Sequence, residues 1–440
     1  MRKILFIVSV TVALLSCAKQ EQVTESRHPK WAYDATIYEL NTRQATPEGT
    51  FAAAEELLPT LKENGIDIIW VMPCQPIGVI TRKGTLGSYY SIIDYCQINP
   101  EFGTRADFEH FLAKAHEMGF KVILDWVANH TAPDSEWTKH DGWHHRDKDG
   151  NLMVQYDWTD ISKLNYDNKD MRNEMLKAMH WWMDSIGIDG FRCDVAGEVP
   201  TDFWNWAMSD LRQSHPEMFT LAEDEGKADE LTESAFDMYY GWTLHHIMNE
   251  VAQGKATVED LWSYFAKADS TIRPEAIRMN FITNHDENSW NGTEFERMGK
   301  EGAKLFAAFC YIVPGMPMIY TGQLSGNHHR LQFFEKDLID NDKEYSLKDL
   351  YKQLNTLRAD NSALQSNELG APMVRIPVDN DAIFACVRSN GQNTVLAVMN
   401  MSDKQQDVKA DLSSIKDLPN GLKKSQDFNL LPWGYTIKAW

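Results

Sequence analysis

The sequence predicts an α/β protein: a (β/α)8 barrel with a loop subdomain after the third strand, followed by an antiparallel β domain. From Thr36 onward, short apolar runs alternate with longer amphipathic segments, which is typical of strand and helix units around a parallel sheet. Eight such runs occur, the number that closes a barrel. The chain has 440 residues, 43% of them hydrophobic, so a large catalytic domain and a smaller one can both be accommodated.

The predicted barrel strands are short apolar runs that end in polar residues. They begin at Ile37, Ile66, Lys121, Gly190, Phe219, Phe236, Met279 and Met316. Helices are expected over 52–63, 105–118, 171–185, 202–214, 258–268 and 294–311, and the last one near 347–358. We assign residues 31–360 to the barrel on this pattern.

Residues 131–163 interrupt the alternation between the third strand and its helix. The segment is rich in Trp, His, Asp and Gly and lacks helical periodicity, so we expect an inserted loop subdomain. Its histidines His140, His144 and His145 lack regular metal-ligand spacing, and we expect them to be polar surface residues.

The pattern changes to strand-like pieces after the last barrel helix. These pieces cover 373–376, 383–388, 394–399 and 434–440, and Asn390-Gly391 is a hairpin signal. We therefore expect a C-terminal β-sandwich over 361–440 that packs against the barrel and has a structural role.

The N-terminus resembles a bacterial lipoprotein signal. Arg2 and Lys3 precede an apolar run, and Leu14-Leu15-Ser16-Cys17 matches a lipobox. The resemblance implies that residues 1–17 are the signal, that Cys17 becomes the lipidated first residue, and that 18–30 form a tether. The apolar run is too short to span a bilayer comfortably, so a lipid anchor to the membrane of the bacterial cell envelope is expected, on its periplasmic or outer-membrane face. The alternative is an ordinary secretory signal with a chance cysteine.

The net charge of −21 argues against nucleic acid as a partner, because a phosphate backbone repels such a surface. A neutral substrate fits this charge, although acidity can also serve solubility alone. Beyond Cys17, five cysteines lie far apart and mostly within apolar runs, and we expect core thiols rather than a disulfide framework. They are Cys74, Cys96, Cys193, Cys310 and Cys386.

Polar residues at the carboxyl ends of the predicted strands are the candidate site, because active sites of such barrels lie there. They are Asp125, Asn129, His130, Arg192, Asp194, Glu223, Asn284, His285 and Asp286. Residues two apart in a strand share a face, so we expect Arg192 to orient Asp194 and keep it ionised. The alternative for this pair is a structural salt bridge.

Glu223 follows an apolar run, and we expect these surroundings and the nearby carboxylates to raise its pKa. The alternative is a solvated charge run with Asp224 and Glu225. Three carboxylates and two histidines around one barrel mouth, without a cofactor motif, suit acid–base and nucleophilic chemistry on a glycosidic bond.

These segments resemble the α-amylase family of glycoside hydrolases. The matching pieces are Asp125-Trp-Val-Ala-Asn-His130, Gly190-Phe-Arg-Cys-Asp194, Leu221-Ala-Glu223 and Phe281-Ile-Thr-Asn-His-Asp286. The resemblance implies that Asp194 is the nucleophile, Glu223 the general acid and base, and Asp286 the carboxylate that stabilises the transition state. In retaining enzymes of this kind, nucleophile and acid lie about 5–5.5 Å apart.

The resemblance also implies roles in substrate binding. His130 and His285 would hydrogen-bond sugar hydroxyls, Tyr90 would stack against the sugar ring, Arg192 would orient Asp194, and Asp125 would support the site from behind. No cofactor is required. Asn129 is a calcium ligand in some relatives, but the loop 41–49 lacks the spaced aspartates that bind calcium in some members, so a metal site stays undetermined.

Two departures from the family pattern concern the surroundings of the site. The chain has Val195-Ala-Gly-Glu198 where many starch-degrading relatives carry a lysine-histidine pair, and Gln323 where many have glutamate. Binding on the acceptor side is therefore open.

The sequence thus predicts a retaining hydrolase of α-1,4-glucosidic bonds in starch, maltooligosaccharides or related α-glucans. The alternatives are an α-glucan transglycosylase, which uses the same three carboxylates, and a noncatalytic glucan-binding lipoprotein. The complete carboxylate set argues against the last of these.

Overall fold

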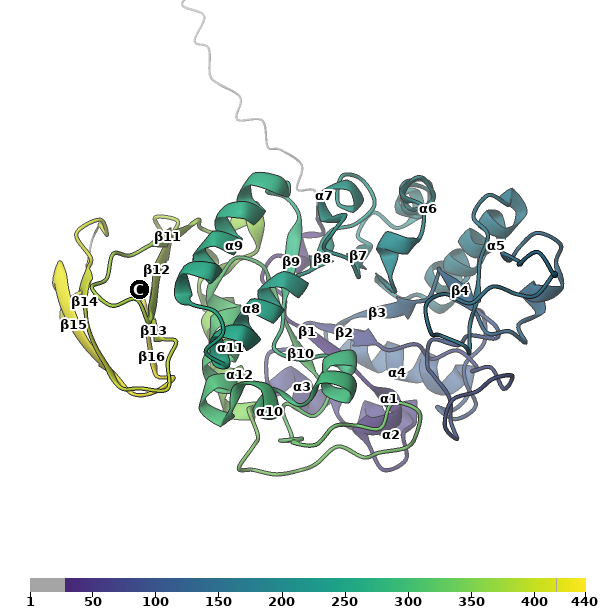
Figure 1. The fold of residues 1–440 in the computed structure, drawn as a ribbon, viewed down its shortest axis with the longest axis horizontal. Coiled ribbons are helices and arrows are strands. Elements are labelled where there is room, and N and C mark those ends of the chain that lie inside the picture. Colours follow the sequence, from purple (N-terminus) through teal and green to yellow (C-terminus); the bar gives the residue numbers. More distant parts are fainter. Residues whose placement is uncertain (1–27, 417) are drawn as a thin grey trace, which may run out of the picture.

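The computed structural model describes residues 28–416 and 418–440, and its centre is a closed barrel of parallel strands (Figure 1). The strand order around the barrel is β1-β10-β9-β8-β7-β6-β3-β2. The strands are β1 (Ile37–Leu40), β2 (Ile68–Val71), β3 (Lys121–Trp126), β6 (Gly190–Cys193), β7 (Phe219–Ala222), β8 (Met238–Tyr240), β9 (Ile277–Asn280) and β10 (Met316–Tyr320). The predicted barrel is confirmed, and each strand begins within two residues of its expected start.

The barrel strands are buried on both faces, which explains their nearly continuous apolar runs. Some charged residues interrupt these apolar runs. Glu39 of β1, Asp125 of β3 and Arg192 of β6 have no exposed surface and occupy the carboxyl-terminal halves of their strands. Buried charges of this kind persist when they are paired and hydrogen-bonded.

The helices that follow the strands cover the barrel. They are α1 (Thr42–Ala45), α2 (Phe51–Glu55), α3 (Leu58–Glu63), α4 (Arg105–Glu117), α5 (Lys169–His180), α6 (Thr201–Ser214), α7 (Ala228–Leu231), α8 (Trp242–Ala252), α9 (Val258–Thr271), α10 (Glu294–Met298), α11 (Lys300–Ile312) and α12 (Lys348–Asp360). The sequence analysis missed α1, α7 and α8.

Two expected helices are each divided in the structure, for local reasons. Pro59 lies in the first turn of α3, where a proline favours a new helix start over continuation of α2. Gly299 between α10 and α11 has a φ of 71°, a conformation that interrupts a helix and that glycine adopts readily.

The loop subdomain after β3 is closed by a short antiparallel pair, β4 (His130–Thr131) with β5 (Ser162–Lys163). It contains a short 3-10 helix, Glu136–Lys139. The expectation that its three histidines are surface residues is wrong for His144, which is buried and bonds Thr131 at 2.9 Å.

Two antiparallel sheets follow the barrel and lie at the left of Figure 1 in yellow. One contains β11 (Met373–Arg375), β12 (Ile383–Ser389), β13 (Thr394–Asn400) and β16 (Tyr435–Ala439), and the other β14 (Gln406–Asp411) and β15 (Ser425–Leu430). β12 and β13 form the hairpin expected around Asn390-Gly391. Residues of both sheets, among them Val398 and Val408, share one apolar core.

The predicted signal and lipobox, including Cys17, lie outside the described residues. Within the described part of the chain, every helix is too short or too polar to cross a bilayer. The five cysteines beyond Cys17 are free thiols, as predicted.

Candidate active site

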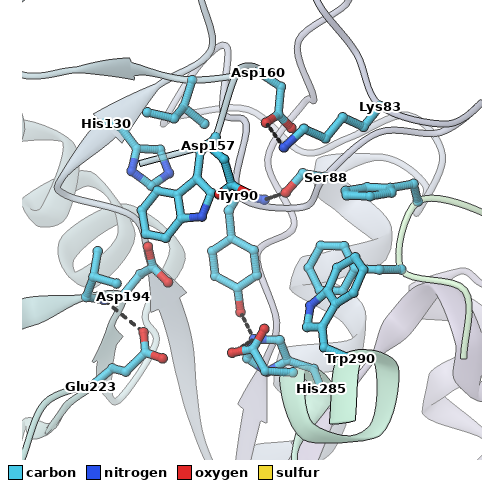
Figure 2. A pocket seen from close by; sticks show the side chains of 16 residues that line it. Lys83, Ser88, Tyr90, His130, Asp157, Asp160, Asp194, Glu223, His285 and Trp290 are labelled. Atoms are coloured by element: carbon cyan, nitrogen blue, oxygen red, sulfur yellow. Dashed lines mark hydrogen bonds and ion pairs between the residues drawn. The ribbon is translucent and has the colours of Figure 1, made fainter. Parts of the chain in front are cut away.

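A pocket of about 480 Å³ opens at the carboxyl ends of the barrel strands (Figure 2). Six of the eight predicted catalytic and binding residues line it: Tyr90, His130, Asp194, Glu223, His285 and Asp286. The other two, Asp125 and Arg192, lie behind this lining and contact it. The structure therefore brings the whole predicted set together from β3, β4 and β6 and from the segments that follow β2, β6, β7 and β9.

Arg192 is the centre of the cluster. Its Nη1 lies 2.8 Å from Asp125 and 3.1 Å from Asp194, and its Nη2 lies 2.8 Å from Glu223. The guanidinium also lies 4.9 Å from the ring centroid of Trp70. One buried cation thus fixes the positions of three carboxylates on three neighbouring strands.

Asp194 differs from the expectation that Arg192 keeps it ionised. Burial raises the pKa of Asp194 well above its usual value, and the charge of Glu223 raises it further, while Arg192 opposes both. Arg192 thus favours the ionised form of Asp194, as expected, but the guanidinium is shared with Asp125 and Glu223 and does not outweigh the burial of Asp194. Burial likewise raises the pKa of Asp125, the other carboxylate bound to the same Nη1.

Glu223 is held from the neighbouring strand. The backbone N–H of Val195 donates to its Oε2 at 2.8 Å, and the same oxygen faces Arg192. Val195 has a φ of 36°, a left-handed conformation that is strained for a β-branched residue. This backbone turn directs the N–H of the residue after Asp194 onto Glu223.

His285 is the cation on the opposite wall. Burial lowers its pKa, but the charges of Asp286 and Glu39 and the hydrogen bond to Glu39 outweigh that effect and raise the pKa from 6.5 to about 9. Its Nε2 lies 2.8 Å from the hydroxyl of Tyr90 and 3.3 Å from Asp286. The Tyr90 hydroxyl in turn donates to Asp125 at 3.1 Å, which links the two walls of the pocket.

His130 is neutral, because burial lowers its pKa to about 4. The amide of Asn129 donates to its Nδ1 at 3.1 Å, which leaves the proton on Nε2. Nε2 is a buried atom without a hydrogen-bond partner among the described residues, and the His130 side chain lines the pocket.

The residues around Asn129 do not fit a calcium site. Its amide nitrogen donates to Gln155 at 2.8 Å as well as to His130. Within residues 28–416 and 418–440, there is also no group of three His, Cys, Asp or Glu side chains that could hold a metal. Calcium prefers several carboxylate and carbonyl oxygens, whereas the Asn129 side chain uses its amide nitrogen toward both neighbours.

The departures noted in the sequence also have structural reasons. A Cβ at Gly197 would lie 2.1 Å from Oδ2 of Asp224, so a side chain at this position would require the Asp224 carboxylate to move. Glu198 accepts hydrogen bonds from Gln155 and Tyr156, which fastens the turn after Asp194 to the loop subdomain. Gln323 is buried and bonds Tyr320 and Tyr351, so it supports the end of β10.

Several pocket residues were missed by the sequence analysis. They are Lys83, Ser88, Asp157, Trp158, Asp160, Ile161, Val195, Trp290, Phe333 and Phe334. Except for Val195, which follows Asp194, and Trp290, which lies in the short helix Glu287–Asn291, they lie on loops away from the barrel strand ends. Trp290, which is 52% exposed, follows Asp286 by one helical turn, and that spacing was an available signal.

Comparisons with known proteins agree with this geometry. The family model "Alpha amylase, catalytic domain" matches residues 32–142 and 138–367. The crystal structure of an α-amylase from Lactobacillus plantarum is similar with a TM-score of 0.82 and 28% identity, covering 92% of this chain and 99% of that one.

Two curated relatives are similar in sequence. Alpha-amylase MalA of Haloarcula japonica is 28% identical over 396 residues, which are 86% of this chain and 56% of the relative. The α-1,4-glucan:maltose-1-phosphate maltosyltransferase of Picrophilus torridus is 25% identical, covering 90% of this chain and 67% of the relative. The chain thus spans only part of the length of these relatives. The match of the family model over most of the chain establishes that the protein belongs to the α-amylase family of glycoside hydrolases.

Proposed function

We propose that the protein is a retaining glycoside hydrolase that cleaves α-1,4-glucosidic bonds in starch, maltooligosaccharides or related α-glucans. The observation that carries the proposal is the contact of Arg192 with both Asp194 and Glu223, which presents two carboxyl groups from adjacent strand ends to one pocket. A nucleophile and an acid–base placed in this way are what double displacement requires.

In the first step, Asp194 attacks the anomeric carbon while Glu223 gives its proton to the leaving glycosidic oxygen. The bond to the leaving sugar breaks, and a covalent glycosyl–Asp194 ester forms. The reactive form of the coupled carboxylates is the one with the proton on Glu223 and the charge on Asp194. Because Oε2 of Glu223 already faces Val195 and Arg192, Oε1 is the oxygen that carries the proton.

In the second step, Glu223 takes a proton from water and the water oxygen attacks the anomeric carbon. The ester bond breaks and Asp194 is released as the anion. Two inversions at the same carbon give net retention of configuration. Asp286, 36% exposed at the pocket, stabilises the positive charge of the transition state, while His130 and the His285 cation bond hydroxyls of the sugar.

Product analysis on maltoheptaose, with and without an added acceptor sugar, tests this proposal. The expected result is release of shorter maltooligosaccharides in water, with little change when the acceptor is present. Products longer than maltoheptaose would instead support transglycosylation, the activity that the name of the Picrophilus torridus relative states. A lack of any cleavage would contradict both and favour a binding protein.

We further propose that the mature protein is lipid-anchored through Cys17 in the bacterial cell envelope. The support is the lipobox and the position of His28, whose ring bonds Asp237 at 2.8 Å and the carbonyl of Glu275 at 2.7 Å. These partners precede β8 and β9, so His28 lies at the barrel end opposite the pocket. An anchor on this side keeps the pocket turned toward solvent.

Fatty-acid labelling and membrane fractionation of Cys17→Ala test the anchor. The variant should lose the label and leave the mature membrane fraction. If it still fractionates as a labelled, processed lipoprotein, the anchor is not at Cys17.

A further inference from the structure

We propose that the pocket is closed at the end opposite Glu223, so that the enzyme degrades α-glucans from their non-reducing chain ends. The inference rests on the proposed hydrolase function and adds the part of the polymer on which it acts. Its basis is Lys83, which lies where three separate loops meet.

Lys83 belongs to the loop between β2 and α4. Its Nζ lies 3.1 Å from Asp160 of the loop subdomain and 6.0 Å from the ring centroid of Phe334, which belongs to the loop after β10. All three side chains line the pocket. The Asp160 side chain is only 5% exposed, whereas that of Lys83 is 32% exposed, so the ion pair joins a buried carboxylate to an ammonium at the pocket surface.

Hydrogen bonds fasten the β2 loop to the loop subdomain on either side of Lys83. The hydroxyl of Thr81 donates to the carbonyl of Thr159 at 2.8 Å, and the hydroxyl of Ser91 donates to the carbonyl of Asp160 at 2.6 Å. The loop after β2 and the loop subdomain therefore form one continuous wall.

The same β2 loop is fastened to the loop after β10. The backbone N–H of Thr85 donates to Glu335 at 2.9 Å, and that of Leu86 donates to the carbonyl of Phe334 at 3.0 Å. Because one segment bonds both neighbours within a few residues of Lys83, the wall is continuous across all three loops. These joined loops form the barrier that the proposal assigns to this end of the pocket.

The position of the wall decides which end of the substrate it meets. Glu223 protonates the leaving oxygen, so the leaving part of the chain, toward the reducing end, lies beside Glu223. Figure 2 shows Lys83 and Asp160 across the pocket from Glu223, with Tyr90 between them. The wall therefore lies on the glycone side, where the Lys83 ammonium and the Asp160 carboxylate can bond the hydroxyls of a terminal sugar.

The test compares maltoheptaose with maltoheptaose whose non-reducing-end sugar carries an acetal across two hydroxyls. Chromatography with mass detection gives kcat/KM for each. We expect the acetal to lower kcat/KM by at least about tenfold, because the closed pocket must reject the added atoms. Products from unblocked maltoheptaose should start with a single size released from the non-reducing end.

Two variants locate the closure. Lys83→Ala removes the side chain that contacts the other two loops. Asp160→Asn keeps the shape of the side chain that pairs with Lys83 but removes its negative charge. Both should reduce the discrimination against the blocked substrate, whereas Lys139→Ala, which removes an exposed ion pair with Glu136 in the same subdomain, should leave it unchanged. Thermal unfolding of each variant checks that it is folded.

The outcomes separate this inference from the proposed function. If neither substrate is cleaved, the hydrolase function itself fails. If the wild type cleaves both with equal kcat/KM, the function stands and chain-end action is wrong. If the wild type discriminates but both folded pocket variants keep the full discrimination, the closure assigned to Lys83 and Asp160 is wrong.

Discussion

The backbone N–H of Val195 donates a hydrogen bond to Glu223 at 2.8 Å, and Val195 directly follows Asp194 in the chain. The residue after the proposed nucleophile thus positions the proposed acid. The strand register also fixes the spacing of the two carboxyl groups, because Cys193 of β6 pairs with Ala222 of β7 and the two carboxyl residues come next in each strand.

Asp194→Asn should lower kcat on maltooligosaccharides by at least about 10³-fold, because the covalent step loses its nucleophile. The amide has nearly the volume of the carboxyl group, so thermal unfolding should change little. The assay is maltoheptaose turnover, with circular dichroism as the control for folding. Turnover near that of the wild type would contradict the assignment.

Glu223→Gln should spare substrates with good leaving groups relative to starch, because a stable leaving anion needs no proton. Rates of the glycosylation step on aryl maltosides and on maltoheptaose measure the difference. Equal losses on both would mean that another group is the acid, and Glu198→Gln and Glu225→Gln would then be compared with it.

The acid limb of kcat/KM against pH should lie above the usual pKa of an aspartate, because burial and then Glu223 raise the pKa of Asp194. As pH falls through this raised pKa, Asp194 takes up a proton and activity is lost. Asp125→Asn removes one of the charges that raise the pKa of Asp194, and Arg192 is then shared by fewer carboxylates. The acid limb of the variant should therefore move to lower pH. If the acid limb of the Asp125→Asn variant were unchanged or moved to higher pH, Asp194 would not be the group that governs this limb. The control is Asp170→Asn on α5, which should leave the acid limb unchanged.

Glu39→Gln should lower the pKa of His285 from about 9, because Glu39 contributes both charge and a hydrogen bond to the raised value. An NMR titration of the His285 ring, assigned with His285→Asn, measures the shift. The raised pKa also means that protonated His285 stabilises the fold below pH 6.5 and that this contribution is lost as pH rises through about 9. A His285 pKa that is unaffected by the substitution would remove Glu39 from this network.

The barrel and the polar strand ends were predictable because both follow from local patterns. Apolar runs mark the strands, and Asp194 and Glu223 directly follow two of them. The loop residues of the pocket were not predictable in this way. Lys83 and Phe334 meet only after folding, because loops 251 positions apart in the chain are brought together by closure of the barrel between β1 and β10.

The raised pKa of Asp194 could not be predicted from the sequence either. Arg192 lies two residues away and was expected to act on Asp194 alone. In the folded chain, the same guanidinium contacts Asp125 of β3 and Glu223 after β7, which the sequence places 67 and 31 positions away from it. The sequence identifies the partners, whereas their shared use of one cation is a property of the tertiary structure.

The most direct test of double displacement is proton NMR of the first sugar released from an α-linked maltooligosaccharide, recorded before mutarotation. The proposed roles of Asp194 and Glu223 require two inversions at the anomeric carbon, so the new reducing end should appear first as the α anomer. First appearance of the β anomer would mean a single displacement by water and would contradict Asp194 as the nucleophile.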